Sequence, residues 1–101
     1  MTAFFIFMHF VYILYSSSID RFYIGETEDL EVRLSQHNNG FFKGAFTSQV
    51  SDWSFYLTLQ CRDRSHARGV EAFIKKQKSA AFIKRLKSNE KIQKDIIEKH
   101  L

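Results

Sequence analysis

Residues 10–25 of the chain read FVYILYSSSIDRFYIG, and this stretch decides the fold. It opens with a continuous apolar and aromatic run, FVYILY, which is typical of a buried strand. The following SSSID has the composition of a turn. Residues 21–25 then return as a second run of strand-forming residues. We therefore expect strands over residues 10–15 and 21–25 that pair as an antiparallel hairpin.

A helix is expected directly after the hairpin. Thr27 can cap its N-terminus, and Glu28 and Asp29 in the first turn would complement the helix dipole. The sequence Asn-Asn-Gly at residues 38–40 is a stop signal, so the helix should end near its first residue. Residues 41–51 show little periodicity and are expected to form a loop.

The second half of the chain predicts one more strand and three helices. Residues 52–61 alternate apolar with polar residues, as in a strand whose one face carries Trp53, Phe55, Leu57 and Leu59. A helical stripe follows over residues 65–78, Ser79 can cap a short helix, and Ser88 or Asn89 can open a last one. The predicted fold class is α+β, with a small three-stranded antiparallel sheet flanked by helices in the order ββα-β-ααα.

Composition and charge limit the classes of protein to which the chain can belong. A chain of 101 residues with 45% hydrophobic residues is long enough for one domain with its own core. Residues 62–101 hold 12 Lys/Arg against 5 Asp/Glu, whereas residues 1–61 hold 3 against 6. A basic half suits a polyanionic partner such as nucleic acid. The single cysteine, Cys61, is expected to be a buried strand residue, and it favours a cytoplasmic location.

The N-terminal residues 1–15, MTAFFIFMHFVYILY, are strongly apolar. They are shorter than the roughly 20 residues that span a bilayer, and they lack the basic start and the cleavage site of a secretory signal. We therefore expect residues 1–9 to be an apolar extension and residues 10–101 to be a single domain that needs no membrane. Two alternatives stay open: the protein starts at Met8, or the extension is a weak membrane-surface anchor.

A small set of side chains suited to phosphodiester hydrolysis stands out in the predicted elements. Arg33 and His37 are four residues apart and share one helix face. Tyr12 and Tyr23 can stand side by side on the paired strands. Glu71 is the one carboxylate between residues 64 and 81, in a stretch rich in Lys and Arg. Arginine matches phosphate oxygens, one carboxylate suffices for Mg²⁺, and a tyrosine near a cation can serve as a base.

Each of these residues also has a purely structural interpretation. The tyrosines could be core residues, and His37 could be a helix-end residue that the dipole favours. Arg33 could pair with Asp29 one turn back, an ion pair that contributes only about 0.3–0.5 kcal/mol. Glu71 could pair with Lys75 in the same way. The combination, rather than any single residue, therefore carries the functional interpretation.

The order and spacing of these residues resemble those of the GIY-YIG nuclease superfamily. The two name-giving motifs correspond to VYIL at residues 11–14 and YIG at residues 23–25. They are followed by an arginine and a histidine on the next helix and by a glutamate in a Lys-rich helix. The resemblance covers roughly residues 8–87. It is strongest to small stand-alone bacterial members, similar to the nuclease domain of the excision-repair incision subunit and to small structure-specific endonucleases.

The resemblance implies a role for each position that matches the family pattern. Tyr12 and Tyr23 would be the paired active-site tyrosines, with Tyr23 as the general base. Arg33 would bind the scissile phosphate, His37 would assist proton transfer, and Glu71 would hold Mg²⁺ or Mn²⁺. Further contacts to the substrate are expected from Gly25, at a backbone-permissive position after the second strand, and from Arg68, Lys75, Lys76 and Lys84.

The sequence departs from the family pattern at two places near these motifs. Phe10 stands where the family name places a glycine. Glu26 follows the second motif where a lysine or another phosphate-friendly residue is common, so an extra carboxylate is expected to repel the substrate.

The function expected from the resemblance is that of a metal-dependent endonuclease that hydrolyses DNA, in repair or in the processing of branched or damaged DNA. The alternative is a nucleic-acid-binding module of the same fold with weak or no catalysis. DNA is the expected partner, a further protein could target the domain to it, and the chain is expected to be a monomer or a weak dimer.

Overall fold

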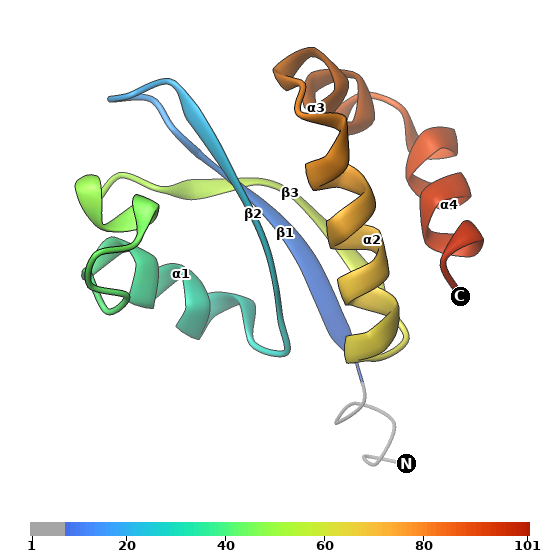
Figure 1. The fold of residues 1–101 in the computed structure, drawn as a ribbon, viewed down its shortest axis with the longest axis horizontal. Helices are drawn as coiled ribbons and strands as arrows, with labels where there is room; N and C mark the ends of the chain where they lie inside the picture. The colour runs from blue at the N-terminus through green and yellow to red at the C-terminus, as the bar shows by residue number, and fades with distance from the viewer. Residues whose placement is uncertain (1–7) are drawn as a thin grey trace.

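The computed structural model describes residues 8–101, and Figure 1 shows how its elements are arranged. The strands are β1 (His9–Ser16), β2 (Arg21–Thr27) and β3 (Ser54–Cys61), and the helices are α1 (Leu30–Asn38), α2 (Arg64–Gln77), α3 (Ala80–Lys87) and α4 (Glu90–Lys99). A short 3₁₀ helix, η2 (Phe46–Gln49), lies in the expected loop. The α+β class and the order ββα-β-ααα are confirmed, with η2 as an addition.

The sheet has the strand order β2-β1-β3, and the central strand β1 is antiparallel to both neighbours. In the β1–β2 hairpin, Tyr12 lies opposite Gly25 and Leu14 lies opposite Tyr23. Directly opposite residues of a strand pair point to the same face of a sheet, so all four belong to one face. β2 is an edge strand, and its outer side can be approached from both faces of the sheet.

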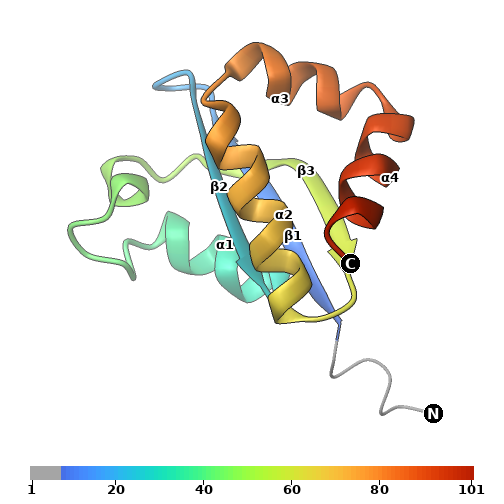
Figure 2. The same ribbon diagram turned by 45° about the vertical axis from the view of Figure 1, so that its right-hand side comes forward.

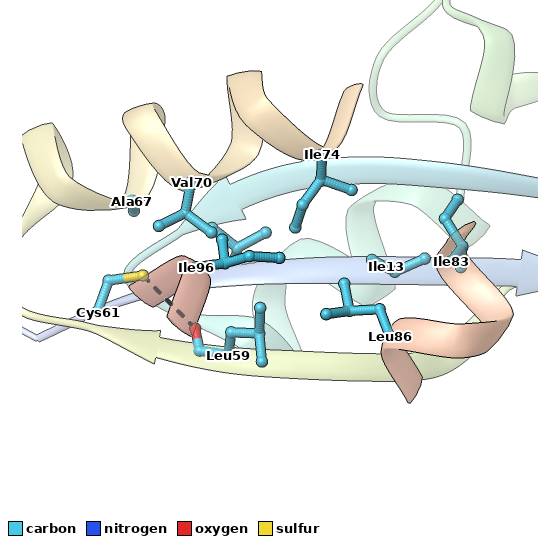
Figure 3. Close-up of a cluster of buried hydrophobic side chains, with 10 residues drawn as sticks. Ile13, Leu59, Cys61, Ala67, Val70, Ile74, Ile83, Leu86 and Ile96 are labelled. Carbon is cyan, nitrogen blue, oxygen red and sulfur yellow. Dashed lines mark hydrogen bonds between the residues drawn. The ribbon is translucent and has the colours of Figure 1, made fainter. Parts of the chain in front are cut away.

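Helices cover both faces of the sheet, α1 on one and α2 to α4 on the other (Figure 1, Figure 2). On the α1 face, Tyr12, Leu14 and Trp53 are buried, and Leu30 and Leu34 of α1 pack against them. The larger cluster lies between the sheet and α2 to α4 (Figure 3), and its buried members are Val11, Ile13, Leu59, Cys61, Ala67, Val70, Ile74, Ile83, Leu86 and Ile96. Alternate residues of β1 therefore enter two separate cores.

A β-bulge in β3 changes the alternation that the sequence predicts. Phe55 and Leu57 pair with consecutive residues of β1, so Tyr56 is the extra residue on β3. The single face expected for the apolar residues of this strand is therefore wrong. Trp53 and Phe55 pack in the cluster under α1, whereas Leu57 and Leu59 pack in the cluster under α2.

Side-chain caps fix where the helices begin. The carboxylate of Asp29 accepts a hydrogen bond from Val32 N and caps α1. The expected cap, Thr27, is wrong, because Thr27 is the buried last residue of β2. Ser79 caps α3 as expected, and Asn89 is the one of the two candidates that caps α4.

The expected apolar extension, residues 1–9, lies largely outside the described residues, although His9 already belongs to β1. Cys61 is buried at the end of β3, as the sequence predicts. No helix within residues 8–101 has the length and apolar character needed to cross a membrane.

Candidate active site

Tyr12 is the centre of a polar cluster between the sheet and α1. Its side chain is only 1% exposed, and its ring lies against Gly25, the opposite residue on β2. A Cβ atom on Gly25 would lie 2.4 Å from Tyr12 Oη and 2.5 Å from its Cζ, so a side chain there would displace the ring. The expectation that Gly25 follows the second strand is wrong. It lies inside β2, and its role there is to leave room for Tyr12.

A chain of hydrogen bonds links Tyr12 to the loop after α1. Tyr12 Oη is 2.8 Å from His37 Nε2, and His37 Nδ1 is 2.7 Å from Thr47 Oγ1. All three side chains are buried. A neutral imidazole has one N–H. Both hydrogen bonds can form together when the phenol donates to Nε2 and Nδ1 donates to the threonine hydroxyl. The backbone of Thr47 is held in turn, because its carbonyl accepts a hydrogen bond of 2.9 Å from Trp53 Nε1.

Burial sets the protonation states in this chain. Desolvation raises the pKa of the Tyr12 phenol, and the neighbouring Tyr23 adds to the rise. The Arg33 guanidinium lowers the pKa of Tyr12 by hydrogen bonding and charge, while the Glu71 carboxylate raises it. Desolvation also lowers the pKa of His37 to about 4, with a further contribution from the charge of Arg33. Near neutral pH the phenol is therefore protonated and the imidazole is neutral.

Arg33 and His37 lie on the same side of α1, as their spacing predicts. The Arg33 guanidinium carbon lies 5.5 Å from the ring centroid of Phe42, and the His37 ring lies 4.9 Å from the same ring. Arg33 Nη1 also donates to the carbonyl of Glu26 at 3.4 Å. The alternative ion pair with Asp29 is not formed among residues 8–101, since that carboxylate caps α1.

Tyr23 is the more accessible of the two tyrosines. It is half-buried, with its ring centroid 6.3 Å from that of Tyr12 and 4.9 Å from that of His37. The prediction that the two tyrosines stand on one sheet face is confirmed. Of the pair, only Tyr23 has enough exposed surface to meet water or a substrate.

Glu71 approaches the cluster from the opposite layer of the fold. It lies on α2, which covers the other face of the sheet, yet its carboxylate is close enough to Tyr12 to affect the pKa of the phenol. Because β2 is an edge strand, a side chain of α2 can approach Tyr12 around the outer side of β2. Glu71 Oε2 also pairs with Lys75 Nζ at 2.8 Å. The fold thus gathers five of the predicted residues, Tyr12, Tyr23, Arg33, His37 and Glu71.

The comparison with known families fits this arrangement. The family model of the GIY-YIG catalytic domain matches residues 8–92. The chain belongs to the GIY-YIG family. The match runs from β1 into α4 and includes all five gathered residues, so the domain is of the nuclease type. No curated protein and no solved structure gives a significant match to the chain.

The GIY-YIG cluster has a donor set suited to a loosely held divalent cation. Within the described part of the chain, no three His, Cys, Asp or Glu side chains converge as a metal cage. Glu71 is the one carboxylate beside the tyrosines, and the Lys75 ammonium already places a cation on its Oε2. Mg²⁺ keeps several waters and binds through one or two carboxylates together with substrate phosphate. The residues present therefore fit such an ion.

A basic groove of about 370 Å³ runs between the start of β2, the end of α2 and α3. Asp20 is the one acidic residue that lines it. Two of the four basic residues expected to contact the substrate line this groove, and two are exposed on α2 outside it. The cations of the groove are Arg21, Lys75, Lys78 and Lys84, and the two outside it are Arg68 and Lys76.

Glu26 does not face the tyrosines, although it directly follows Gly25. It lies opposite Val11, whose side chain belongs to the core under α2, so it points to the other face of the sheet. Its carboxylate pairs with His9 Nε2 and lies 3.8 Å from Arg64 Nε. The Arg64 guanidinium partly offsets its charge, and the repulsion of substrate that the sequence predicts is weakened accordingly.

Sequence reasoning missed two residues of the site, Phe42 and Thr47. Both lie between α1 and β3, where the sequence shows no helical or strand periodicity from which the position of a side chain could be predicted. Thr47 is only 1% exposed, which is unusual for a threonine in a loop. Its proximity to His37 follows from the path of the loop, and no local sequence signal indicates it.

Proposed function

We propose that this chain is a metal-dependent endonuclease that hydrolyses phosphodiester bonds of DNA. One observation carries the proposal. An arginine and a half-buried tyrosine lie beside the buried Tyr12–His37 hydrogen bond, and a carboxylate of α2 is near enough to shift the pKa of Tyr12, in a domain of the nuclease type. GIY-YIG nucleases act on DNA, and the basic groove beside β2 supplies the charge that a polyanion requires.

The two tyrosines have different tasks in this proposal. Tyr12 is buried and keeps its proton, so it orients the site through its hydrogen bond to His37. Tyr23 reaches the surface and acts as the general base after its phenol has released a proton to solvent. The phenolate accepts a proton from the attacking water, whose oxygen bonds to phosphorus as the P–O bond to the leaving oxygen breaks. Neutral His37 fixes the geometry of both rings from within.

Arg33 and Glu71 bind the reacting phosphate and the cation. The guanidinium of Arg33 offers two parallel N–H donors to phosphate oxygens, and the Phe42 ring holds its plane. Glu71 would hold Mg²⁺ or Mn²⁺, which when bound neutralises negative charge on the leaving oxygen. With an ion bound to Glu71, Lys75 would be free to contact a phosphate.

The cellular role that fits the proposal is DNA repair or the processing of branched or damaged DNA in the cytoplasm. Cys61 suits a reducing compartment, because burial raises the pKa of its thiol and keeps it unreactive. The small domain offers basic helices for affinity, a targeting protein would add to its affinity for DNA, and we expect a monomer or a weak dimer.

The test is cleavage of a panel of single-stranded, duplex, flap and junction DNA with Mg²⁺ or Mn²⁺. Glu71→Gln and Arg33→Ala should each lower the cleavage rate by at least about a hundredfold, the scale expected when a group that stabilises the transition state is lost. Asp95→Asn is the matched control for Glu71→Gln, because Asp95 also pairs with a lysine four residues away, on α4.

Thermal unfolding of each variant shows whether the fold survives the substitution. Wild-type protein that binds DNA but cleaves no member of the panel would contradict the enzyme proposal. The same fold would then be a DNA-binding module, in which Arg33→Ala weakens binding and Glu71→Gln does not.

A further inference from the structure

Phe41 presents an unusually exposed aromatic ring beside the candidate active site. Its side chain is 64% exposed, more than that of any other phenylalanine with a large exposed surface in the described chain. Single exposed apolar residues are common on protein surfaces and need no explanation. Phe41 differs in two ways. Its ring packs against Phe42, which contacts residues of the candidate active site, and hydrogen bonds hold its backbone in place.

The backbone around Phe41 is fixed by a built turn. Gly40 and Gly44 have φ angles of 69° and 79°, in the left-handed region that favours glycine. Phe41 N donates to Gln36 O at 2.9 Å, which ties the residue to the last turn of α1, and Ala45 N donates to Phe42 O at 2.9 Å. The backbone of Phe41 is therefore held by a defined turn, and its ring is exposed at the surface.

A series of rings connects Phe41 to the catalytic cluster. Its centroid lies 5.1 Å from that of Phe42, with the two planes nearly perpendicular at 85°. Phe42 in turn lies 4.9 Å from the His37 ring and beneath the Arg33 guanidinium. Phe41 therefore lies within reach of a base one or two nucleotides from a phosphate bound by Arg33.

The charge of this surface favours a polyanion such as nucleic acid over a basic or neutral partner. Between residues 32 and 51 the sequence contains Arg33 and Lys43 and no Asp or Glu. Lys43 is exposed next to the two phenylalanines. Positive charge interleaved with aromatic rings is the combination that binds single strands, because bases stack on the rings while the cations follow the phosphates.

We propose that Phe41 stacks on an unpaired base one or two nucleotides from the phosphate bound by Arg33, so that the preferred substrate carries a single-stranded arm at the cleavage site. The inference rests on the proposed function and specifies its substrate class. A base inside a duplex has both faces covered by its neighbours, and only an unpaired or terminal base offers a face to a protruding ring.

Metal-free binding measurements test the inference without relying on cleavage. Fluorescence anisotropy would compare a blunt duplex with the same duplex carrying a five-nucleotide single-stranded arm. A 2-aminopurine at the first unpaired position would report stacking by quenching. Wild type should prefer the armed duplex and quench the probe, and Phe41→Ala should lose about tenfold in affinity for the armed duplex and none for the blunt one.

Three further variants separate stacking from general apolar contact. Phe41→Tyr should keep the preference, whereas Phe41→Leu should lose it, because leucine retains apolar bulk but has no aromatic face. Val32→Ala removes another exposed apolar side chain, 51% exposed on α1, and should bind like wild type. Thermal unfolding should be unchanged in all four variants, since both residues are largely exposed.

The outcomes distinguish the inference from the function on which it rests. If Phe41→Leu behaves like wild type, or Phe41→Ala retains the arm preference and the quenching, the stacking site is overturned while DNA binding stands. If wild-type protein binds neither substrate, the proposed function itself fails.

Discussion

Gly25 is the residue on which the geometry of the site depends most directly. A methyl group there would lie within 3.0 Å of three atoms of the Tyr12 side chain, which is buried and hydrogen-bonded to His37. We expect Gly25→Ala to lower the free energy of unfolding by about 1–3 kcal/mol, as for overpacking of a filled core. Cleavage should fall more steeply than stability, because the shifted ring breaks its bond to His37. Urea unfolding and single-turnover cleavage would measure the two effects.

Gly69 on α2 provides the matched control for this substitution. A Cβ atom there would lie 3.6 Å from the nearest atom of His100, an ordinary contact. Gly69→Ala should therefore raise the free energy of unfolding by about 0.5–1 kcal/mol, the gain of alanine over glycine inside a helix, and leave cleavage unchanged. Equal effects of the two substitutions would contradict the proposed role of Gly25.

Residue spacing predicts the site only where a regular element carries it. Arg33 and His37 could be placed together because a helix brings residues four apart onto one face, and Tyr12 and Tyr23 because paired strands align their side chains. Thr47 and Phe42 could not be placed, because the loop path that brings them to His37 depends on tertiary contacts such as the Trp53 Nε1 bond to Thr47 O.

At the scale of elements, the strands and helices were predictable within two residues, whereas a bulge and a cap were not. The apolar pattern of residues 52–61 is compatible with an uninterrupted strand, and only pairing with β1 reveals the extra residue, Tyr56. Thr27 and Asp29 are both good N-caps, and the choice between them depends on how far β2 pairs with β1. Local sequence sets the type of an element, and its partners set its ends.

An ion pair on helix α2 joins the proposed metal ligand, Glu71, to a basic residue, Lys75. Lys75 Nζ lies 2.8 Å from Glu71 Oε2 and competes with a divalent cation for the carboxylate. Replacing the lysine by glutamine should lower the Mg²⁺ concentration for half-maximal cleavage by about twofold, since an exposed i,i+4 pair is worth about 0.3–0.5 kcal/mol. A Mg²⁺ titration of the cleavage rate measures the shift.

Lys76→Gln is the control for that prediction, because Lys76 is the exposed neighbour on the same helix and carries the same charge. It should leave the Mg²⁺ requirement unchanged while weakening DNA binding slightly. A Mg²⁺ requirement that moves equally in both variants would point to general electrostatics and not to competition at Glu71.

At the scale of the whole molecule, the sequence predicts a sheet flanked by helices, but it does not predict which side chains of the helices and the sheet come together at the site. Hydrophobic periodicity gave a sheet with helices, and the excess of Lys and Arg in the second half fell on the elements that cover one face. No local sequence pattern predicts that Glu71, on α2, lies near Tyr12 on the opposite face of the sheet. This proximity depends on β2 being an edge strand, which is a property of the assembled sheet.

The pH dependence of unfolding tests whether the buried Tyr12–His37–Thr47 chain stabilises the whole domain. The pKa of His37 is lowered from 6.5 to about 4 in the folded protein. Between these values the unfolded chain binds more protons than the folded one, so stability is highest above pH 6.5 and falls as the pH drops toward 4. The loss should approach about 3 kcal/mol at most, from about 1.4 kcal/mol per pH unit.

Urea unfolding of wild type and His37→Gln at several pH values between 4 and 7 would measure this loss. The variant has no titrating group at the position, so its stability should change less across the window, and the two curves should converge toward pH 4. Hydrogen bonds lower the pKa values of Asp52 and Asp63, but both contributions are lost only as the pH falls below the ordinary carboxylate value of 3.8. Parallel curves for wild type and variant would show that His37 is not held neutral by the fold, and the buried chain would then lose its place in the proposed mechanism.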